Sequence, residues 1–142
     1  MILMDIKGNL HDPRVLALLS YCQYAPTEEK LKRLVDDFAS DKDVHAFSCT
    51  QGDALAGVII LKRWQNASFE ILGIAVDPAC RGRGIGTAMI HETAKHLSCA
   101  EIYAETDDDA VMFYKQCGFT VQALGEKYPG VMRYLCTLVN DA

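Results

Sequence analysis

The chain lacks the features that mark secreted, disulfide-rich and membrane proteins. Its six cysteines form no CxxC pair and lie apart, at positions 22, 49, 80, 99, 117 and 136. Dispersed cysteines of this kind indicate reduced thiols rather than a disulfide framework. No apolar run approaches the ~20 residues that a membrane helix needs, and the first residues carry acids too early for a signal peptide. We therefore expect a soluble, cytoplasmic protein with no membrane partner.

The chain also has few basic residues and no histidine pair at a metal-binding spacing. Lys and Arg total 14 against 19 Asp and Glu, a formal net charge of -5. Binding to nucleic acid rests on neutralising phosphates, so the composition predicts no nucleic-acid partner. Arg81 and Arg83 form the only basic pair beside a glycine-rich loop. His91 and His96 miss the HExxH spacing, and we expect no metal.

What the chain does have is the composition of one globular domain, residues 1–142. Hydrophobic residues make up 50% and charged residues 23%, which is ordinary globular usage. Periodicity and turn residues predict helices at 13–22, 27–40, 85–97 and 109–117, and strands at 2–6, 44–50, 55–64, 69–76, 101–106, 119–123 and 131–138. The strand–helix–strand order over 69–106 implies one parallel pair. The predicted class is therefore α+β, with a mostly antiparallel sheet.

The rest of the chain is organised around residues 69–97. This stretch reads as a buried strand, a stop at Asp77-Pro78, a glycine-rich loop at 81–86 and an amphipathic helix. The N–H groups at the start of a helix have no partner within it and carry the positive end of its dipole. Glycines there let a ligand come close to the backbone. The stretch therefore predicts a phosphate cradle.

The spacing within the loop narrows the kind of phosphate. The P-loop string GxxxxGK[ST] is absent, and a dinucleotide GxGxxG pattern that begins at Gly82 fails at Thr87. What remains is Arg81-x-x-Gly84-x-Gly86, directly after a strand. The loop is therefore neither of the two commonest nucleotide-binding loops, and we expect a phosphate-binding loop of another class.

A second motif, Ala110-x-x-Phe113-Tyr114-x-x-x-Gly118-Phe119, follows the first. Together the two resemble the GNAT superfamily of acetyl-CoA-dependent N-acetyltransferases, whose signature is [RQ]xxGxG/A between a strand and a helix. The resemblance implies a three-layer α/β/α fold with a mixed, mostly antiparallel sheet, one splayed parallel pair and about four helices. It also implies acetyl transfer from acetyl-CoA, as co-substrate, to a primary amine of a small molecule or a protein, by direct attack in a ternary complex. A non-catalytic acyl-CoA-binding sensor is the alternative.

The resemblance also assigns the cofactor contacts. The loop amides would bind the CoA pyrophosphate, Thr87 could add its hydroxyl, and pantetheine would run along the strand through the backbone of Ile74 and Val76. Many family members carry Asn at the position of Asp107, and Asp lacks the amide donor that bonds pantetheine. The candidate cofactor residues are Ile74, Ala75, Val76, Arg81, Gly82, Arg83, Gly84, Ile85, Gly86, Thr87, Asp107, Ala110 and Phe113.

Two side chains are candidates for proton transfer. Tyr114 matches the tyrosine that protonates the CoA sulfur in this family, and a phenol keeps its proton at pH 7; aromatic packing is the alternative. Glu70 is the only ionisable side chain inside the central strand, where some members carry a general base. Alternation places it on one face with Leu72, Ile74 and Val76. The alternative is a solvated or paired carboxylate.

The acids after the fifth strand allow two interpretations. Glu105, Asp107, Asp108, Asp109 and Glu126 could form an acidic rim that attracts a cationic amine. Acids at a helix start also satisfy its N–H groups and its dipole, and we favour this second interpretation for the run of three Asp.

Weaker signals concern the acceptor side. The predicted loop 124–130 lies where such enzymes often contact substrate. Tyr21, Tyr24 and Trp64 are candidates to line the acceptor site, although core packing is favoured for Trp64. Cys80 is interpreted as a loop thiol rather than an acyl carrier. Exposed apolar strand edges are compatible with a homodimer.

Overall fold

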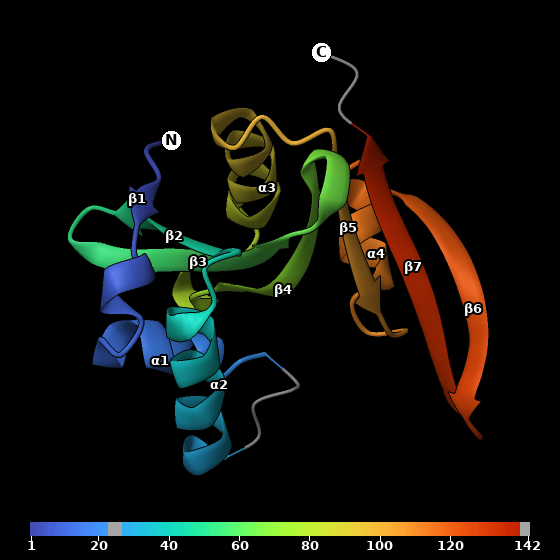
Figure 1. Cartoon of the computed structure of the whole chain (residues 1–142), viewed down its shortest axis with the longest axis horizontal. Helices are drawn as coiled ribbons and strands as arrows, with labels where there is room; N and C mark the ends of the chain where they lie inside the picture. The colour runs from blue at the N-terminus through green and yellow to red at the C-terminus, as the bar shows by residue number, and fades with distance from the viewer. Residues whose placement is uncertain (23–26, 140–142) are drawn as a thin grey trace.

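The computed structural model describes residues 1–22 and 27–139. Within them a mixed sheet has the order β1-β2-β3-β4-β5-β7-β6 and one parallel pair, β4 with β5 (Figure 1). The strands are β1 Met4–Asp5, β2 Val44–Gln51, β3 Ala54–Arg63, β4 Ser68–Val76, β5 Glu101–Thr106, β6 Thr120–Tyr128 and β7 Val131–Val139; the α-helices are α1 Pro13–Leu19, α2 Glu28–Ser40, α3 Ile85–His96 and α4 Val111–Gln116. None of the described helices has the length and apolar composition needed to cross a membrane. The predicted fold class is confirmed.

Both N-terminal helices begin at the residues that the sequence indicates. Asp12 Oδ1 accepts a hydrogen bond from the amide of Arg14 (2.8 Å), and Pro13 is the first residue of α1. Thr27 Oγ1 accepts from the amide of Lys30 (3.1 Å), one turn into α2. Each cap satisfies an amide that has no partner within its helix, which contributes about 1 kcal/mol.

Helices cover both faces of the sheet and give the fold its three layers. On one face, Val35 of α2 shares a buried cluster with Val58 and Ile60 of β3. On the other, Ile90 of α3 shares a cluster with Ile59 of β3 and with residues of α4. Figure 1 shows α3 on one side of β2, β3 and β4, and α1 with α2 on the opposite side.

The parallel pair is short and then splays apart. β4 pairs with β5 only over Ser68–Glu70, opposite Glu101–Tyr103. In Figure 1, β5 turns away from β4 beyond this point. The remainder of β4 keeps β3 on one side, and none of the described strands pairs with its other side. β4 therefore has a free backbone edge that leads toward the loop at 81–86.

A β-bulge interrupts β4 shortly after the splay begins. Leu61 of β3 lies opposite Ile71, whereas the preceding Ile60 lies opposite Gly73. Leu72 is therefore an extra residue in β4. One extra residue in a strand inverts the alternation of side chains between the two faces of the sheet.

The bulge corrects one prediction about Glu70. Leu72 packs with the cluster under α1 and α2, whereas Ile74 packs with the cluster under α3 and α4 and Val76 with residues of α3. Glu70 lies opposite Lys62, whose ammonium pairs with the residue that follows α2. Glu70 thus shares the α1–α2 face with Leu72. The prediction that it also shares a face with Ile74 and Val76 is wrong, because the extra residue separates them.

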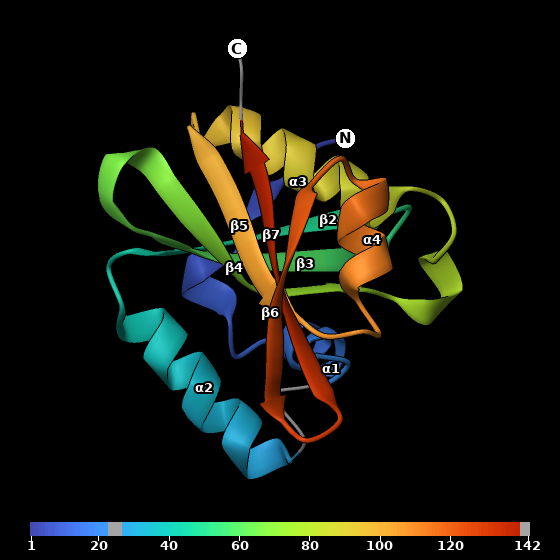
Figure 2. The same ribbon diagram turned by 90° about the vertical axis from the view of Figure 1, so that its right-hand side faces the viewer.

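The final hairpin also differs from prediction. The loop expected at 124–130 is replaced by a two-residue turn, Pro129-Gly130, because β6 continues to Tyr128. Gly130 has a φ of +81° and permits the tight reversal, while Gly125, with a φ of +93°, lies at a register irregularity within β6. Residues 126–128 therefore extend from a strand. Figure 2 looks onto this hairpin, with α4 beside it and α1 and α2 toward its turn.

Candidate functional site

The glycine-rich loop joins β4 to α3 with an open backbone. Gly82 and Gly84 have φ angles of +79° and +75°, a region that glycine enters without strain. α3 begins at Ile85, with Gly84 as its N-cap and no side-chain cap. The first amides of α3 are therefore left without a capping side chain, which is the arrangement that anions bind at a helix start.

Gly82, Gly84 and Gly86, the three glycines of the loop at 81–86, differ in the space around them. A Cβ added at Gly82 or Gly84 would meet no atom within 4 Å. A Cβ added at Gly86 would lie 2.9 Å from two ring carbons of Phe113. Gly86 therefore allows α3 to approach α4, and the first motif packs directly on the second. The open glycines and uncapped amides fit a pyrophosphate group, whereas Gly86 serves helix packing.

Arg81 supplies positive charge next to these amides and is held by two contacts. Its Nε donates a hydrogen bond to the carbonyl of Val76, the last residue of β4 (3.1 Å). Its guanidinium carbon lies 5.3 Å from the ring centre of Tyr21, just beyond α1. Arg83, two residues further on, is exposed. The loop thus combines free amides with two basic side chains.

Side chains also reach the free edge of β4. The carbonyl of Ile74 accepts a hydrogen bond from Cys22 Sγ (3.7 Å), and the carbonyl of Val76 accepts from Arg81. Ala75, between them, is buried in the cluster under α1 and α2. Sequence reasoning missed Cys22, since no motif or spacing connects it with Ile74, 52 residues away.

Tyr114 is the buried residue of α4, with 6% of its surface exposed. Its ring meets those of Phe113 and Phe119 edge-on, at centroid distances of 5.1 and 5.2 Å. Burial raises the pKa of its phenol well above the usual range, followed by the electrostatic effects of the thiols of Cys136, Cys22 and Cys117. The phenol is a protonated group near the thiol that contacts the free edge of β4. The phenol is therefore in its protonated form near neutral pH.

Glu70 lies at the last paired residue of β4 and β5, partly buried. Its Oε1 accepts a hydrogen bond from Trp64 Nε1 (3.1 Å), and Lys62 Nζ lies 4.7 Å from the centre of the Trp64 ring. In β5 its neighbour is Tyr103, whose pKa is raised by burial and then by the charges of Glu70 and Glu101. The carboxylate thus has a hydrogen-bond donor beside it.

Two of the three acceptor-side candidates lie within the described residues. Trp64 is 47% exposed and Tyr21 is 53% exposed. The prediction of core packing for Trp64 is therefore wrong, since its indole lies at the surface next to Glu70. Tyr24 lies outside the described residues.

The acids after β5 are engaged in local structure. Asp107 Oδ1 accepts from the amides of Asp109 (3.0 Å) and Ala110 (3.3 Å), at the turn that precedes α4. Asp108 Oδ1 accepts from the hydroxyl of Tyr134 (2.6 Å). Nearby, Glu105 pairs with Arg133 at 3.2 Å, while Glu126 is exposed on β6. Asp107 thus satisfies amides of the turn before α4, whereas the N-cap of α4 is Ala110, which has no side-chain cap, and Asp108 bonds Tyr134 instead.

Thr87, His91 and Cys80 contact parts of the fold other than the loop. Thr87 Oγ1 lies 3.2 Å from Cys117 Sγ, and His91 Nε2 lies 3.2 Å from the Cys117 carbonyl, so both tie α3 to the end of α4. Cys80 is buried in a cluster with Ile85 of α3. Within residues 1–22 and 27–139, no group of His, Cys, Asp and Glu side chains is placed to hold a metal ion.

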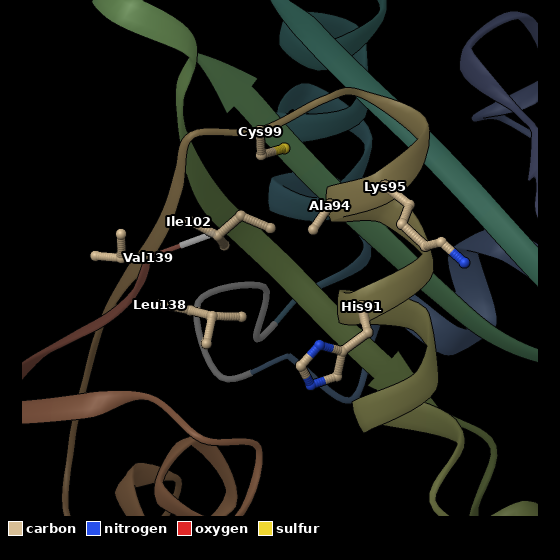
Figure 3. A pocket seen from close by; sticks show the side chains of 7 residues that line it. All are labelled: His91, Ala94, Lys95, Cys99, Ile102, Leu138 and Val139. Atoms are coloured by element: carbon tan, nitrogen blue, oxygen red, sulfur yellow. The ribbon is translucent and has the colours of Figure 1, made fainter. Parts of the chain in front are cut away.

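A cavity of about 300 Å³ lies at the other end of α3 (Figure 3). Its lining residues come from α3, β5 and β7 and the turn between α3 and β5, and they are His91, Ala94, Lys95, Cys99, Ile102, Leu138 and Val139. None of the predicted site residues belongs to it. The candidate site is therefore the free edge of β4 and the loop, rather than this cavity.

A model of the acetyltransferase (GNAT) family matches residues 13–119. The chain belongs to this family. GNAT membership supports an acyltransferase and accounts for both motifs, since the match extends through Phe119. The described sheet and helices carry the motifs as the family resemblance implied.

Two relatives named as N-acetyltransferases are similar in sequence over part of their length. The chain is 28% identical over 103 residues to the uncharacterised N-acetyltransferase YvbK of Bacillus subtilis, a match that covers 68% of this chain and 65% of YvbK. It is 36% identical over 76 residues to the N-alpha-acetyltransferase RimI of Mycobacterium tuberculosis, which covers 51% of this chain and 48% of RimI. The matches thus span about half to two thirds of these relatives.

Solved GNAT structures share the whole fold. The TM-score is 0.79 with a GNAT-family acetyltransferase from Desulfovibrio desulfuricans, at 19% identity and 97% and 98% coverage of the two chains. It is 0.74 with a Bacillus subtilis acetyltransferase in complex with CoA, at 22% identity and 97% coverage of both. It is 0.76 with the aminoglycoside 6'-N-acetyltransferase of Enterococcus faecium, at 18% identity and 98% and 97% coverage. At such identities the likeness concerns the fold.

Proposed function

We propose that the chain transfers the acetyl group of acetyl-CoA to a primary amine by direct attack in a ternary complex. The observation that carries this proposal is the loop at 81–86. Its glycines open the backbone, the first amides of α3 lack a side-chain cap, and the free edge of β4 leads directly to it. A phosphate-bearing ligand with an extended arm fits such a combination, and the GNAT family match supports acetyl-CoA.

The chain's own groups would divide the binding of this co-substrate. The amides after Gly84, together with Arg81 and Arg83, would hold the pyrophosphate. The carbonyl of Ile74, which now accepts from Cys22, and the amide of Val76 would pair with the pantetheine arm, while Arg81 would keep its bond to the carbonyl of Val76. Thr87 contributes packing to α4, because its hydroxyl lies at Cys117. Acetyl-CoA supplies the activated acyl group.

Asp107 would take a structural role in this arrangement. Its Oδ1 accepts two backbone amides at the turn before α4, and a carboxylate has no proton to donate to pantetheine. The carbonyl and amide groups of β4 would therefore carry more of the contact than in family members with Asn at this position.

In the transfer, Glu70 and Tyr114 would move the protons. Glu70 accepts a proton from the attacking amine, directly or through water, as the N–C bond forms and the C–S bond breaks. Tyr114 gives its proton to the departing thiolate, since burial keeps the phenol in its protonated form near neutral pH. A primary amine such as that of lysine has a pKa of ~10.4 and needs such a proton acceptor near neutral pH.

The acceptor class and the assembly belong to the same proposal. RimI is named as acting on an N-alpha amine and the Enterococcus faecium enzyme on an aminoglycoside, so both protein and small-molecule amines are acceptor candidates. Exposed apolar side chains along β6 and β7, among them Leu124, Tyr128 and Val131, support a homodimer. The buried cysteines, none of them in a disulfide, support a cytoplasmic location.

A thiol-release assay tests the proposal. Acetyl-CoA is incubated with the protein and a panel of aminoglycosides, polyamines, N-terminal peptides and lysine peptides, and free CoA is measured. We expect turnover with one of these classes, and none with its N-acetylated form. Binding of acetyl-CoA without turnover on any amine would instead favour the sensor alternative, and no binding at all would contradict both.

A further inference from the structure

Two contacts fix the orientation of the Arg81 guanidinium, one within its plane and one across it. The hydrogen bond from Nε to the carbonyl of Val76 (3.1 Å) fixes the rotation of the group within its own plane. The ring of Tyr21, 5.3 Å from the guanidinium carbon, supports one face of that plane. Cation–π contacts of this kind place the cation within about 6 Å of the ring centre.

The same two contacts leave most of the donors of Arg81 available. A guanidinium has five N–H donors, and the bond to Val76 uses only the one on Nε. Within residues 1–22 and 27–139, no carboxylate lies within ion-pair distance of Arg81. Its two terminal nitrogens therefore offer a preset fork for an anion beside the glycines of the loop.

The position of Tyr21 is itself determined by the end of α1. Its amide donates to the carbonyl of Leu18 (3.1 Å), and the next amide, of Cys22, donates to Leu19 (3.0 Å). Cys22 then contacts the carbonyl of Ile74 on β4. The backbone thus holds the ring of Tyr21 at Arg81, and none of the described contacts involves its hydroxyl.

We propose that Tyr21 is a positioning residue that holds Arg81 ready for the pyrophosphate of CoA. The inference rests on the proposed function, because it assumes that this loop binds CoA. An unsupported arginine would lose rotamer freedom when it binds a phosphate, whereas Arg81 has lost much of it beforehand. The turn that follows α1 thereby strengthens the binding of the cofactor.

The first test measures CoA binding by calorimetry at constant salt, with no acceptor and no turnover. Tyr21→Leu should raise the Kd for CoA about two- to five-fold, the range of an exposed cation–π contact. Tyr21→Phe keeps the ring and should restore the wild-type Kd. In steady state Tyr21→Leu should raise the KM for acetyl-CoA and leave kcat at saturation unchanged. Loss of affinity in both variants alike would overturn the proposal.

A double-mutant cycle with Arg81→Met decides whether Tyr21 acts through Arg81. Residues that act as one unit give non-additive effects. We therefore expect Tyr21→Leu to weaken CoA binding in the wild type and to have no further effect in the Arg81→Met background. Equal losses in both backgrounds would overturn the positioning role while leaving the proposed function standing. A wild-type protein that binds no CoA would overturn the proposed function itself, and the inference with it.

Discussion

Around the loop at 81–86, the groups that would hold acetyl-CoA are mainly backbone atoms of one continuous stretch from β4 to α3. Around Glu70, by contrast, the groups that would act on the acceptor are side chains from separate strands. Glycine conformation and the start of a helix place the backbone groups. The side chains near Glu70 depend on how β3, β4 and β5 pair. We call the first region the cofactor side and the second, with Glu70, Trp64 and Lys62, the acceptor side. The comparison teaches that a site can be locally encoded on one side and assembled by strand register on the other.

The largest expected effect distinguishes the proton transfer by Tyr114 from the binding of acetyl-CoA. Tyr114→Phe removes the proton donor and keeps the aromatic packing with Phe113 and Phe119. We expect kcat to fall by about 100-fold, with little change in the KM for acetyl-CoA. Because burial raises the pKa of this phenol, the wild type should not lose turnover through this group at any pH below about 10. Full turnover by the variant would assign Tyr114 to packing alone.

The next effect concerns the acceptor side. Glu70→Gln keeps the size of the side chain and its hydrogen bond from Trp64 but cannot accept a proton. We expect kcat with the true acceptor to fall by about 10- to 100-fold, since water can relay part of the proton transfer. The Kd for CoA should not change. Trp64→Phe is the matched control, because it removes the donor and keeps the carboxylate. Unchanged turnover in Glu70→Gln would contradict a base role.

A third change breaks the contact between the two motifs. Gly86→Ala would place a Cβ 2.9 Å from the ring of Phe113. Overpacking of this kind costs about 1–3 kcal/mol, which urea denaturation would measure as a lower midpoint. Phe113→Leu in the same chain should recover part of the loss. If Gly86→Ala alone left the midpoint in place, α3 and α4 would not be in the close contact described.

A fourth, smaller effect concerns the buried thiol of Cys99, in the turn between α3 and β5. Burial raises the pKa of Cys99 from 9.0 to about 11. Between these values the unfolded chain releases a proton that the folded chain keeps, so stability is complete below pH 9 and falls as the pH rises. The loss from Cys99 alone is about 1 kcal/mol at pH 10. Urea denaturation at pH 8 and pH 10 measures it, and Cys99→Ala should reduce the difference. An identical difference in that variant would rule out this thiol as a source.

The smallest effect tests Asp107. Asn accepts backbone amides in such a turn about as well as Asp, so Asp107→Asn should leave the free energy of unfolding nearly unchanged. It also introduces an amide donor, and one added hydrogen bond should lower the KM for acetyl-CoA about two- to five-fold. Asp107→Ala, which removes the acceptor of the Asp109 and Ala110 amides, should cost about 1 kcal/mol of stability. A KM that rises in Asp107→Asn would mean that the carboxylate itself assists binding.

The cofactor side was largely predictable because its signals are local. Gly82 and Gly84 open the backbone within the loop that the sequence predicts, just as Asp12 and Thr27 cap the two N-terminal helices elsewhere in the fold. The predicted roles of the site residues stay predictions. What sequence reasoning missed spans long separations or depends on register, as with the contact of Cys22 with Ile74 and the exposed position of Trp64.

One misjudged glycine and one extra residue account for the differences in the final hairpin and in β4. Gly125 and Gly130 both resemble turn residues, yet only Gly130 makes the turn, since Gly125 is absorbed as an irregularity within β6. A bulge such as that at Leu72 has no local signature in a strand of mixed apolar residues. It becomes visible only when the partner strand is placed beside it.

The extra residue in β4 constrains what lengths of this strand the fold can tolerate. Before Leu72, Phe69 and Ile71 face α3, and after it Ile74 does. Loss of the extra residue itself would restore regular alternation and leave Phe69, Ile71 and Ile74 facing α3. Loss of Ile71 with the bulge kept would instead turn Glu70 toward α3 and Phe69 toward the opposite face. In descendants of this chain, the bulge is therefore the point at which β4 can shorten by one residue without reversing its faces.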